Sequence, residues 1–181
     1  MKVVLIGYRA TGKSTVGRIL SAKLNINFWD TDVMVEKMMA MPVKEIVAKN
    51  GWDFFRARET EAVKFLTQKG DCVIATGGGV ILSSENVDLL KQAGVIIWIN
   101  APLHDIIERL RKDALNESIR PQFTSGDLVQ ETTDIMKLRL PLYDKAADYI
   151  VDTTDKNADQ VAAEIYQYLL KSGNLDKNNI N

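Results

Sequence analysis

Short apolar runs alternate with longer amphipathic segments along the chain. The clearest runs are rich in β-branched residues and contain no polar position, which predicts strands buried on both faces of a sheet. The longer segments repeat apolar residues every three or four positions, the spacing of an α-helix with one buried side. Strands that alternate with helices in this way indicate an α/β protein with a parallel sheet.

The order of these elements predicts one domain over residues 1–172. Strands are predicted at residues 3–6, 28–32, 72–75, 95–99 and 149–151. Helices are predicted at residues 13–24, 33–39, 43–49, 54–68, 102–112, 128–140 and 158–170, with another that Ser84 opens. Pro42 separates the second helix from the third, and Asn50-Gly51 ends the third.

Two stretches have no clear periodicity. Residues 113–127 mix charged, small and polar side chains around Arg120-Pro121, and so long a loop in a compact domain is typical of a lid. Residues 173–181 are mostly polar, which predicts a flexible tail.

Composition narrows the class of protein. The 181 residues are 46% hydrophobic and 26% charged, which excludes general disorder, and a net charge of −1 gives no overall attraction to nucleic acid or anionic lipid. The lone Cys72 and the lone His104 exclude an internal disulfide and a Cys/His zinc site. No apolar run approaches the length of a bilayer. We therefore expect a monomeric cytoplasmic protein without a nucleic-acid or membrane partner.

The turn between the first strand and the first helix matches the phosphate-binding pattern G-x-x-x-x-G-K-[ST]. Its glycines let backbone N–H groups turn toward a phosphate, Lys13 would bridge the β- and γ-oxygens as a catalytic group, and Ser14 would bind Mg²⁺. The alternative is a glycine-rich turn whose lysine faces water. The predicted nucleotide-binding residues are Gly7, Tyr8, Arg9, Ala10, Thr11, Gly12, Lys13, Ser14 and Thr15.

Two carboxylates follow the second strand. Asp30 and Asp32 flank Thr31, and in an extended chain both would point the same way. We assign Asp30 to the metal and Asp32 to an attacking hydroxyl, whose proton it would accept. A solvated strand end or a helix N-cap is the alternative.

Arginines and glycines supply a candidate acceptor pocket. Arg56 and Arg139 together could bind a substrate carboxylate through paired hydrogen bonds, although surface ion pairs with Glu59 or Glu61 are an equal alternative for the arginines at 56 and 58. Gly77-Gly78-Gly79 could line the pocket with N–H donors, or form an ordinary turn. Arg120 in the lid could stabilise the charge of the transferring phosphoryl group.

Together these motifs resemble the shikimate kinase family over residues 1–170. The motifs that carry the resemblance are residues 7–14, Asp30-Thr31-Asp32, Phe55-Arg56 with Glu59, Ala75-Thr76-Gly77-Gly78-Gly79, Arg120-Pro121 and Arg139-Leu140-Pro141-Leu142-Tyr143. The resemblance implies a three-layer P-loop NTPase fold of the nucleoside-monophosphate-kinase type, with a five-stranded parallel sheet. It also implies a substrate-binding region at residues 33–62 and an ATP lid at residues 113–127.

The resemblance further implies an activity and a set of contacts. The activity is transfer of the ATP γ-phosphoryl group to the 3-hydroxyl of shikimate, in aromatic amino acid biosynthesis, with Mg²⁺. Asp32, Arg56, Gly77, Gly78, Gly79 and Arg139 would bind shikimate; Lys13, Ser14 and Arg120 would handle phosphates; and Arg109 or Arg111 would lie near the adenine. The alternatives are a kinase for another polyol acid such as gluconate, or a regulatory domain that binds ATP without catalysis.

Overall fold

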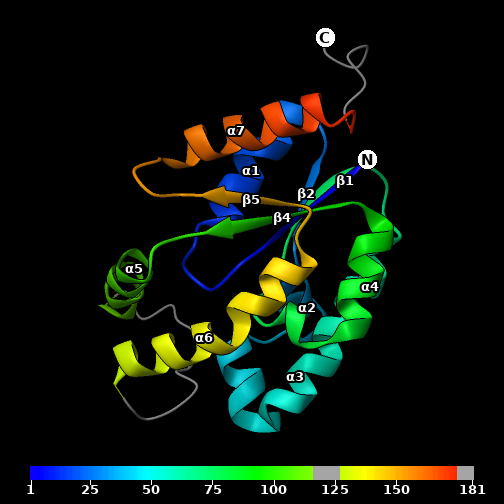
Figure 1. Cartoon of the computed structure of the whole chain (residues 1–181). Helices are drawn as coiled ribbons and strands as arrows, with labels where there is room; N and C mark the ends of the chain where they lie inside the picture. Colours follow the sequence, from blue (N-terminus) through cyan, green and yellow to red (C-terminus); the bar gives the residue numbers. More distant parts are fainter. Residues whose placement is uncertain (116–126, 175–181) are drawn as a thin grey trace.

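A five-stranded parallel sheet forms the middle layer of the computed structural model, which describes residues 1–115 and 127–174 (Figure 1). The strands are β1 (Lys2–Ile6), β2 (Asn27–Asp30), β3 (Cys72–Ala75), β4 (Val95–Asn100) and β5 (Tyr149–Asp152). Their order is β2-β3-β1-β4-β5, with parallel pairing throughout. Strand β1 lies between β3 and β4. The chain leaves β1 and β4 in opposite directions across the sheet, and α/β proteins usually bind ligands at the carboxyl ends of such strands.

Helices cover both faces of the sheet. Figure 1 shows α1 (Lys13–Leu24) and α7 (Ala158–Lys171) on one face. On the other face lie α3 (Val43–Thr67), α4 (Ser84–Ala93), α6 (Leu128–Ala146) and the short 3₁₀ helix η1 (Val80–Leu82). The remaining helices are α2 (Thr31–Met39) and α5 (Leu103–Leu115). The predicted three-layer α/β architecture with five parallel strands is confirmed.

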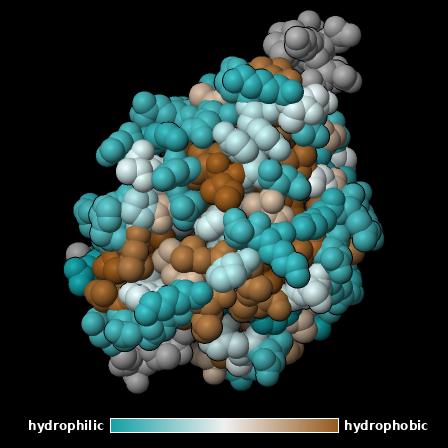
Figure 2. Space-filling model, in the orientation of Figure 1, coloured by the Kyte–Doolittle hydropathy of each residue, from teal (hydrophilic) through white to brown (hydrophobic). Residues whose placement is uncertain are grey.

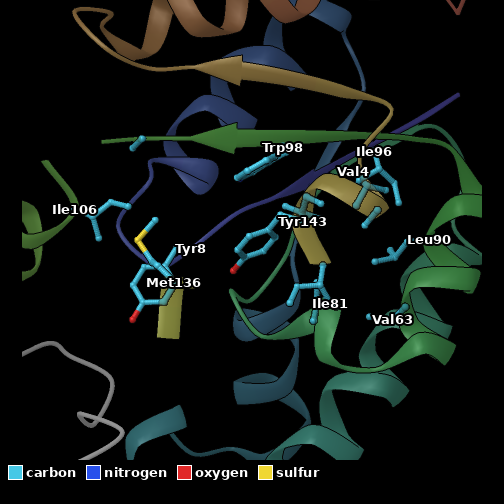
Figure 3. Packing of buried hydrophobic residues seen from close by; sticks show 14 of the residues in the cluster. Val4, Tyr8, Val63, Ile81, Leu90, Ile96, Trp98, Ile106, Met136 and Tyr143 are labelled. Atoms are coloured by element: carbon cyan, nitrogen blue, oxygen red, sulfur yellow. The ribbon is translucent and has the colours of Figure 1, made fainter. Parts of the chain in front are cut away.

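One hydrophobic cluster packs α6 against the central strands β1 and β4. Tyr143 of α6 is fully buried and stacks on Trp98 of β4, with ring centroids 5.6 Å apart (Figure 3). The same figure places Tyr8 beside Met136, about two helical turns before Tyr143 in α6. This contact brings the loop after β1 against α6.

A separate small core holds α2 and α3 together, the segment in which a substrate-binding region was predicted. Val35 of α2 packs with Ile46 and Phe55 of α3, and the side chains of Met34, Met39 and other partly buried residues pack around them. This cluster does not share its buried residues with the two large clusters that cover the sheet.

Helix α2 begins earlier than predicted. Strand β2 ends at Asp30, whose side chain accepts hydrogen bonds from the backbone N–H groups of Asp32 (3.0 Å) and Val33 (3.4 Å). Asp30 is therefore the N-cap, and Thr31 and Asp32 form the first helical turn. The extended conformation predicted for residues 30–32 is confirmed for Asp30 and wrong for residues 31 and 32, because the capping bonds turn the chain into a helix after Asp30. Ser83, not Ser84, caps α4 in the same way.

Helices α3 and α6 run further than predicted. A kink at Gly51, with φ 82° and ψ 172°, joins the two predicted pieces of α3. Helix α6 passes through Pro141, where the sequence predicted its end. Tyr143 and Ala146 are buried beyond that proline, so packing against the sheet favours continuing the helix.

The predicted lid lies largely outside the described residues. Helix α5 continues to Leu115, three residues into the loop predicted from residue 113, and Asp127 caps α6. Arg120 and residues 116–126 are not part of the described structure, and neither are residues 175–181 of the predicted tail.

The surface in Figure 2 is mostly hydrophilic, with apolar atoms gathered over the part of this face that α6 occupies in Figure 1. Leu138 of α6 is 76% exposed and Leu142 is 37% exposed. Across the described ranges, none of the helices is both long and apolar enough to cross a membrane.

Candidate functional site

The phosphate loop closes tightly between β1 and α1. A Cβ atom at Gly7, whose φ is +141°, would collide with the backbone carbonyl of Ile99. Gly12 has a φ of +92° and is the N-cap of α1, without a side-chain cap. Ala10 between them is also left-handed, with φ +62°. The loop therefore takes a conformation that most side chains would resist, and it leaves the first N–H groups of α1 for a ligand.

Lys13 is held inside this loop. Its Nζ donates a 2.6 Å hydrogen bond to the carbonyl of Tyr8, and the residue is only 7% exposed. The Thr11 hydroxyl donates to the same carbonyl at 2.9 Å. The alternative reading, a glycine-rich turn whose lysine faces water, is wrong for this chain.

Two side-chain oxygens that could bind a metal ion lie together at the start of α1. The Ser14 hydroxyl donates to Asp30 Oδ2 at 2.6 Å, so Asp30 both caps α2 and reaches the phosphate loop. No group of three or more His, Cys, Asp or Glu side chains that could hold a metal occurs within residues 1–115 and 127–174. Mg²⁺ beside phosphates commonly takes only one or two protein oxygens. The Ser14–Asp30 pair therefore fits such an ion.

Residues Gly77-Gly78-Gly79 follow β3 and are called the glycine strip here. Two carboxylates approach this strip at Gly77. A Cβ atom at Gly77 would lie 2.7 Å from Asp32 Oδ1 and 2.6 Å from Glu59 Oε1. Its N–H donates to Thr31 Oγ1 at 2.8 Å, which fixes the strip against the first turn of α2. Asp32 thus reaches the strip from a helix, and only a residue without a side chain leaves room for it.

Arg56 lies against Gly79, at the other end of the strip from Gly77. Its guanidinium lies where a side chain at Gly79 would be, and its Nη1 donates to Glu59 Oε2 at 2.7 Å. Glu59 is fully buried; burial raises the pKa of its carboxyl, and the charge of Arg56 opposes that rise. Arg58 instead pairs with Glu61 at 2.8 Å on the surface, so the ion-pair alternative holds for Arg58.

Arg139 reaches the glycine strip from α6. Its Nη1 donates to the carbonyl of Gly78 at 3.2 Å, and the Tyr143 hydroxyl donates to the same carbonyl at 2.5 Å. Arg139 is 7% exposed, and burial lowers the pKa of its guanidinium. Its guanidinium carbon is 5.9 Å from the centroid of the Tyr8 ring. Arg139 therefore lies between the glycine strip and the phosphate loop.

A cavity of about 320 Å³ opens on the other side of the phosphate loop, towards the start of α7. Its lining includes Thr15, Arg109 and Lys156. Arg109 Nη1 also donates to the carbonyl of Ala10 at 3.2 Å. Arg111, the other arginine predicted near the adenine, is exposed and does not line this cavity.

Sequence reasoning missed three of these residues as members of the site. Glu59 could have been found from its position three residues after Arg56, which places both on one side of a helix. Tyr143 likewise lies one turn after Arg139. Lys156 carries no comparable signal, because only the fold brings the loop after β5 to the phosphate loop.

Comparisons with known proteins agree with this geometry. The family model described as "Shikimate kinase" matches residues 9–170. The shikimate kinase of Nitratidesulfovibrio vulgaris is 41% identical, over 83% of this chain and 85% of that protein. The shikimate kinase of Syntrophus aciditrophicus is 37% identical, over 90% and 88%.

Solved structures give the same result. The structure of shikimate kinase from Acinetobacter baumannii in complex with shikimate has a TM-score of 0.88 at 33% identity, covering 94% of this chain and 93% of that one. Shikimate kinase from Aquifex aeolicus has a TM-score of 0.82 at 34% identity, covering 96% and 98%. The family model and these relatives each cover most of the chain, and the chain belongs to the shikimate kinase family.

Proposed function

We propose that this chain transfers the γ-phosphoryl group of ATP to the 3-hydroxyl of shikimate, giving shikimate 3-phosphate and ADP. The observation that carries the proposal is the meeting of Asp32, Arg56 and Arg139 at the glycine strip, beside the phosphate loop. The family supplies the identity of both substrates. The reaction serves aromatic amino acid biosynthesis.

The arginines account for a carboxylated acceptor. Arg56 and Arg139 come from different helices and reach neighbouring glycines, Gly79 and Gly78. A planar guanidinium can give a carboxylate two parallel hydrogen bonds, and partial burial strengthens them. Glu59 would keep the fork of Arg56 in place through their hydrogen bond. Gly77, Gly78 and Gly79 would let the sugar-like ring lie close to the backbone.

Asp32 is the group that would act on the acceptor hydroxyl. As the 3-hydroxyl oxygen forms its bond to the γ-phosphorus, the bond from that phosphorus to the ADP oxygen breaks, and the hydroxyl proton passes to Asp32. Asp32 Oδ1 lies against Gly77, at the end of the strip nearest α2. Its placement orients the hydroxyl toward the nucleotide.

The phosphate loop would hold the triphosphate of ATP. Residues Gly7 to Thr15 would surround the β-phosphate, and the buried ammonium of Lys13 would stabilise charge on the transferring group. Ser14 and Asp30 would hold Mg²⁺, which when bound neutralises charge on the β- and γ-oxygens. Arg109 would contact the base from its place in the cavity, while Arg111 and Arg120 stay predictions.

The cell compartment and the assembly state also belong to the proposal. We expect a monomer, because the described residues proposed for both substrates belong to one chain. The cytoplasm supplies the ATP that the reaction consumes. We expect no role for nucleic acid or a membrane, in keeping with the balanced charge of −1.

An assay of ADP release with alternative acceptors tests the proposal. The purified chain with ATP and Mg²⁺ receives shikimate, gluconate, a nucleoside monophosphate or no acceptor. We expect turnover with shikimate and at least about a hundredfold less with each other condition, because the arginine pair selects a carboxylate and the fixed position of Asp32 selects a hydroxyl at one distance from it. Turnover with gluconate alone would support the polyol-acid alternative. ATP binding without turnover on any acceptor would support a regulatory domain.

A further inference from the structure

We propose that Arg9 and Glu131 are positioning residues that fix α6, and with it Arg139, against the phosphate loop. Arg9 Nη2 donates to Glu131 Oε1 at 3.1 Å, and the two side chains are 10% and 2% exposed. The residues are 122 positions apart in sequence. The proposal rests on the proposed function, because it assigns Arg139 to the acceptor.

The pair joins the phosphate loop to the buried side of α6. Glu131 and Arg139 both belong to that side, eight residues or about 12 Å apart along the helix. Arg9 and Arg139 both approach Tyr8, with guanidinium carbons 5.7 Å and 5.9 Å from the centroid of its ring. Figure 3 shows Met136 of α6 beside the same ring. Helix α6 therefore contacts the loop at each end of the Glu131 to Arg139 segment.

Burial makes this ion pair different from the others along α6. Lys137 and Asp134 are 4.0 Å apart and largely exposed, and such a pair contributes little to stability or geometry. Arg9 and Glu131 are shielded from water, so removing either charge takes a buried, charge-assisted hydrogen bond away from the other. The buried pair therefore strongly favours one position of α6 relative to the loop.

Arg139 needs such a fixed position to work. A two-bond contact between a guanidinium and a carboxylate weakens when its geometry shifts by a fraction of an ångström. Arg139 already spans from Gly78 to the face of Tyr8, so a shift of α6 moves its fork away from the glycine strip. We therefore expect the pair to control binding of the acceptor more than binding of ATP.

The variant Glu131→Gln tests this in the full chain, with Asp134→Asn as its matched control. Asp134 lies one turn along the same helix and accepts an exposed hydrogen bond from Gln130 at 2.8 Å. Steady-state kinetics with shikimate and ATP should show about a tenfold rise in the shikimate KM for Glu131→Gln and less than about a threefold change in the ATP KM. Asp134→Asn should match the wild type. An unchanged shikimate KM in folded Glu131→Gln would overturn the proposal.

A double variant separates positioning from simple stabilisation. Arg9→Met with Glu131→Met removes both charges, which commonly restores the stability that a single deletion loses. We expect its melting temperature to return toward that of the wild type while the shikimate KM stays raised, because two methionines give no directional bond. Recovery of both quantities would show that the pair only stabilises the fold, and it would overturn the proposal. This variant also serves if Glu131→Gln fails to fold.

Hydrogen exchange gives a readout that does not depend on activity. Amides of residues 132–140 should exchange several-fold faster in Glu131→Gln than in the wild type, while those of α7 should not change. Equal exchange in both proteins would overturn the proposal even if the wild type phosphorylates shikimate. A wild type without shikimate turnover would instead refute the proposed function and leave the exchange result to decide whether the pair fixes α6.

Discussion

The two halves of the site are built in different ways. The phosphate loop uses consecutive residues, from Gly7 to Thr15, between a strand and the helix that follows it. The proposed acceptor side takes its residues from α2, α3, the loop after β3, and α6, over more than a hundred residues of chain. A local motif can therefore specify the first half, whereas only the complete fold specifies the second.

The two halves also differ in the hydrogen-bond partners of their charged side chains. Lys13 is held by the carbonyl of Tyr8 in its own loop. Arg56 is held by Glu59 three residues away, and Arg139 by Gly78, 61 positions away. We therefore expect damage to the loop to affect mainly phosphoryl transfer, and damage to the assembled side to affect mainly recognition of the acceptor.

The largest effect should come from Lys13→Ala. Loss of the buried ammonium removes stabilisation of the transferring phosphoryl group, so kcat should fall by about 10³-fold or more. Calorimetric titration should find shikimate binding within about threefold of the wild type, which would show that the two halves act separately. Lys23→Ala, in the last turn of α1, is the control. Near-normal turnover in Lys13→Ala would remove this lysine from the mechanism.

Asp32→Asn should have the next largest effect. An amide in place of the carboxylate cannot accept the hydroxyl proton, so kcat should fall about 10²-fold while the shikimate KM changes little. Steady-state kinetics measure both values, with exposed Asp53→Asn as the control. If only the KM changed, Asp32 would be a binding residue.

Arg139→Lys should act on recognition alone. A lysine keeps the charge but not the planar fork, so the shikimate KM should rise about tenfold with a smaller change in kcat. Arg58→Lys provides a matched control, because Arg58 forms its ion pair with Glu61 at the surface. The same shikimate KM in Arg139→Lys as in the wild type would place Arg139 outside the acceptor site.

The smallest effect concerns pH. Burial raises the pKa of Glu59 above the usual value for a glutamate, so the carboxyl gains its proton earlier as the pH falls. Protonation removes the negative partner of Arg56, and the shikimate KM should then rise about threefold on the acid side. Glu59→Gln should show the raised KM at every pH and lose this dependence.

The matched control for the pH profile is Glu61→Gln, which changes the exposed partner of Arg58. Its KM should follow the profile of the wild type. A Glu59→Gln profile identical to that of the wild type would mean that another group causes the acid limb.

Most of the fold follows from the sequence because its signals are local. The apolar runs at residues 3–6 and 95–99 are buried strands, and the helix predicted at residues 13–24 has the observed bounds. The errors occur where local rules compete with other interactions. Pro141 normally ends a helix, but the burial of Tyr143 favours continuing it.

The site residues, like the fold, were predicted correctly where the signal is local and less well where it depends on other parts of the chain. Strand alternation was the wrong argument for Asp30 and Asp32, because the Asp30 cap starts a helix between them. The chain still brings Asp30 to Ser14 and Asp32 to Gly77. Helical spacing alone could not choose between Arg109 and Arg111, since the choice depends on which side of α5 packs toward the cavity.

The small core shared by α2 and α3 has a consequence for engineering a new acceptor specificity. Val35, Ile46 and Phe55 pack among themselves and several methionines, apart from the clusters that cover the sheet. Methionine side chains adapt to altered neighbours more readily than branched ones do. Substitutions inside this core can therefore adjust the positions of α2 and α3 toward a different hydroxy acid, provided that Asp30, which joins α2 to Ser14, is kept.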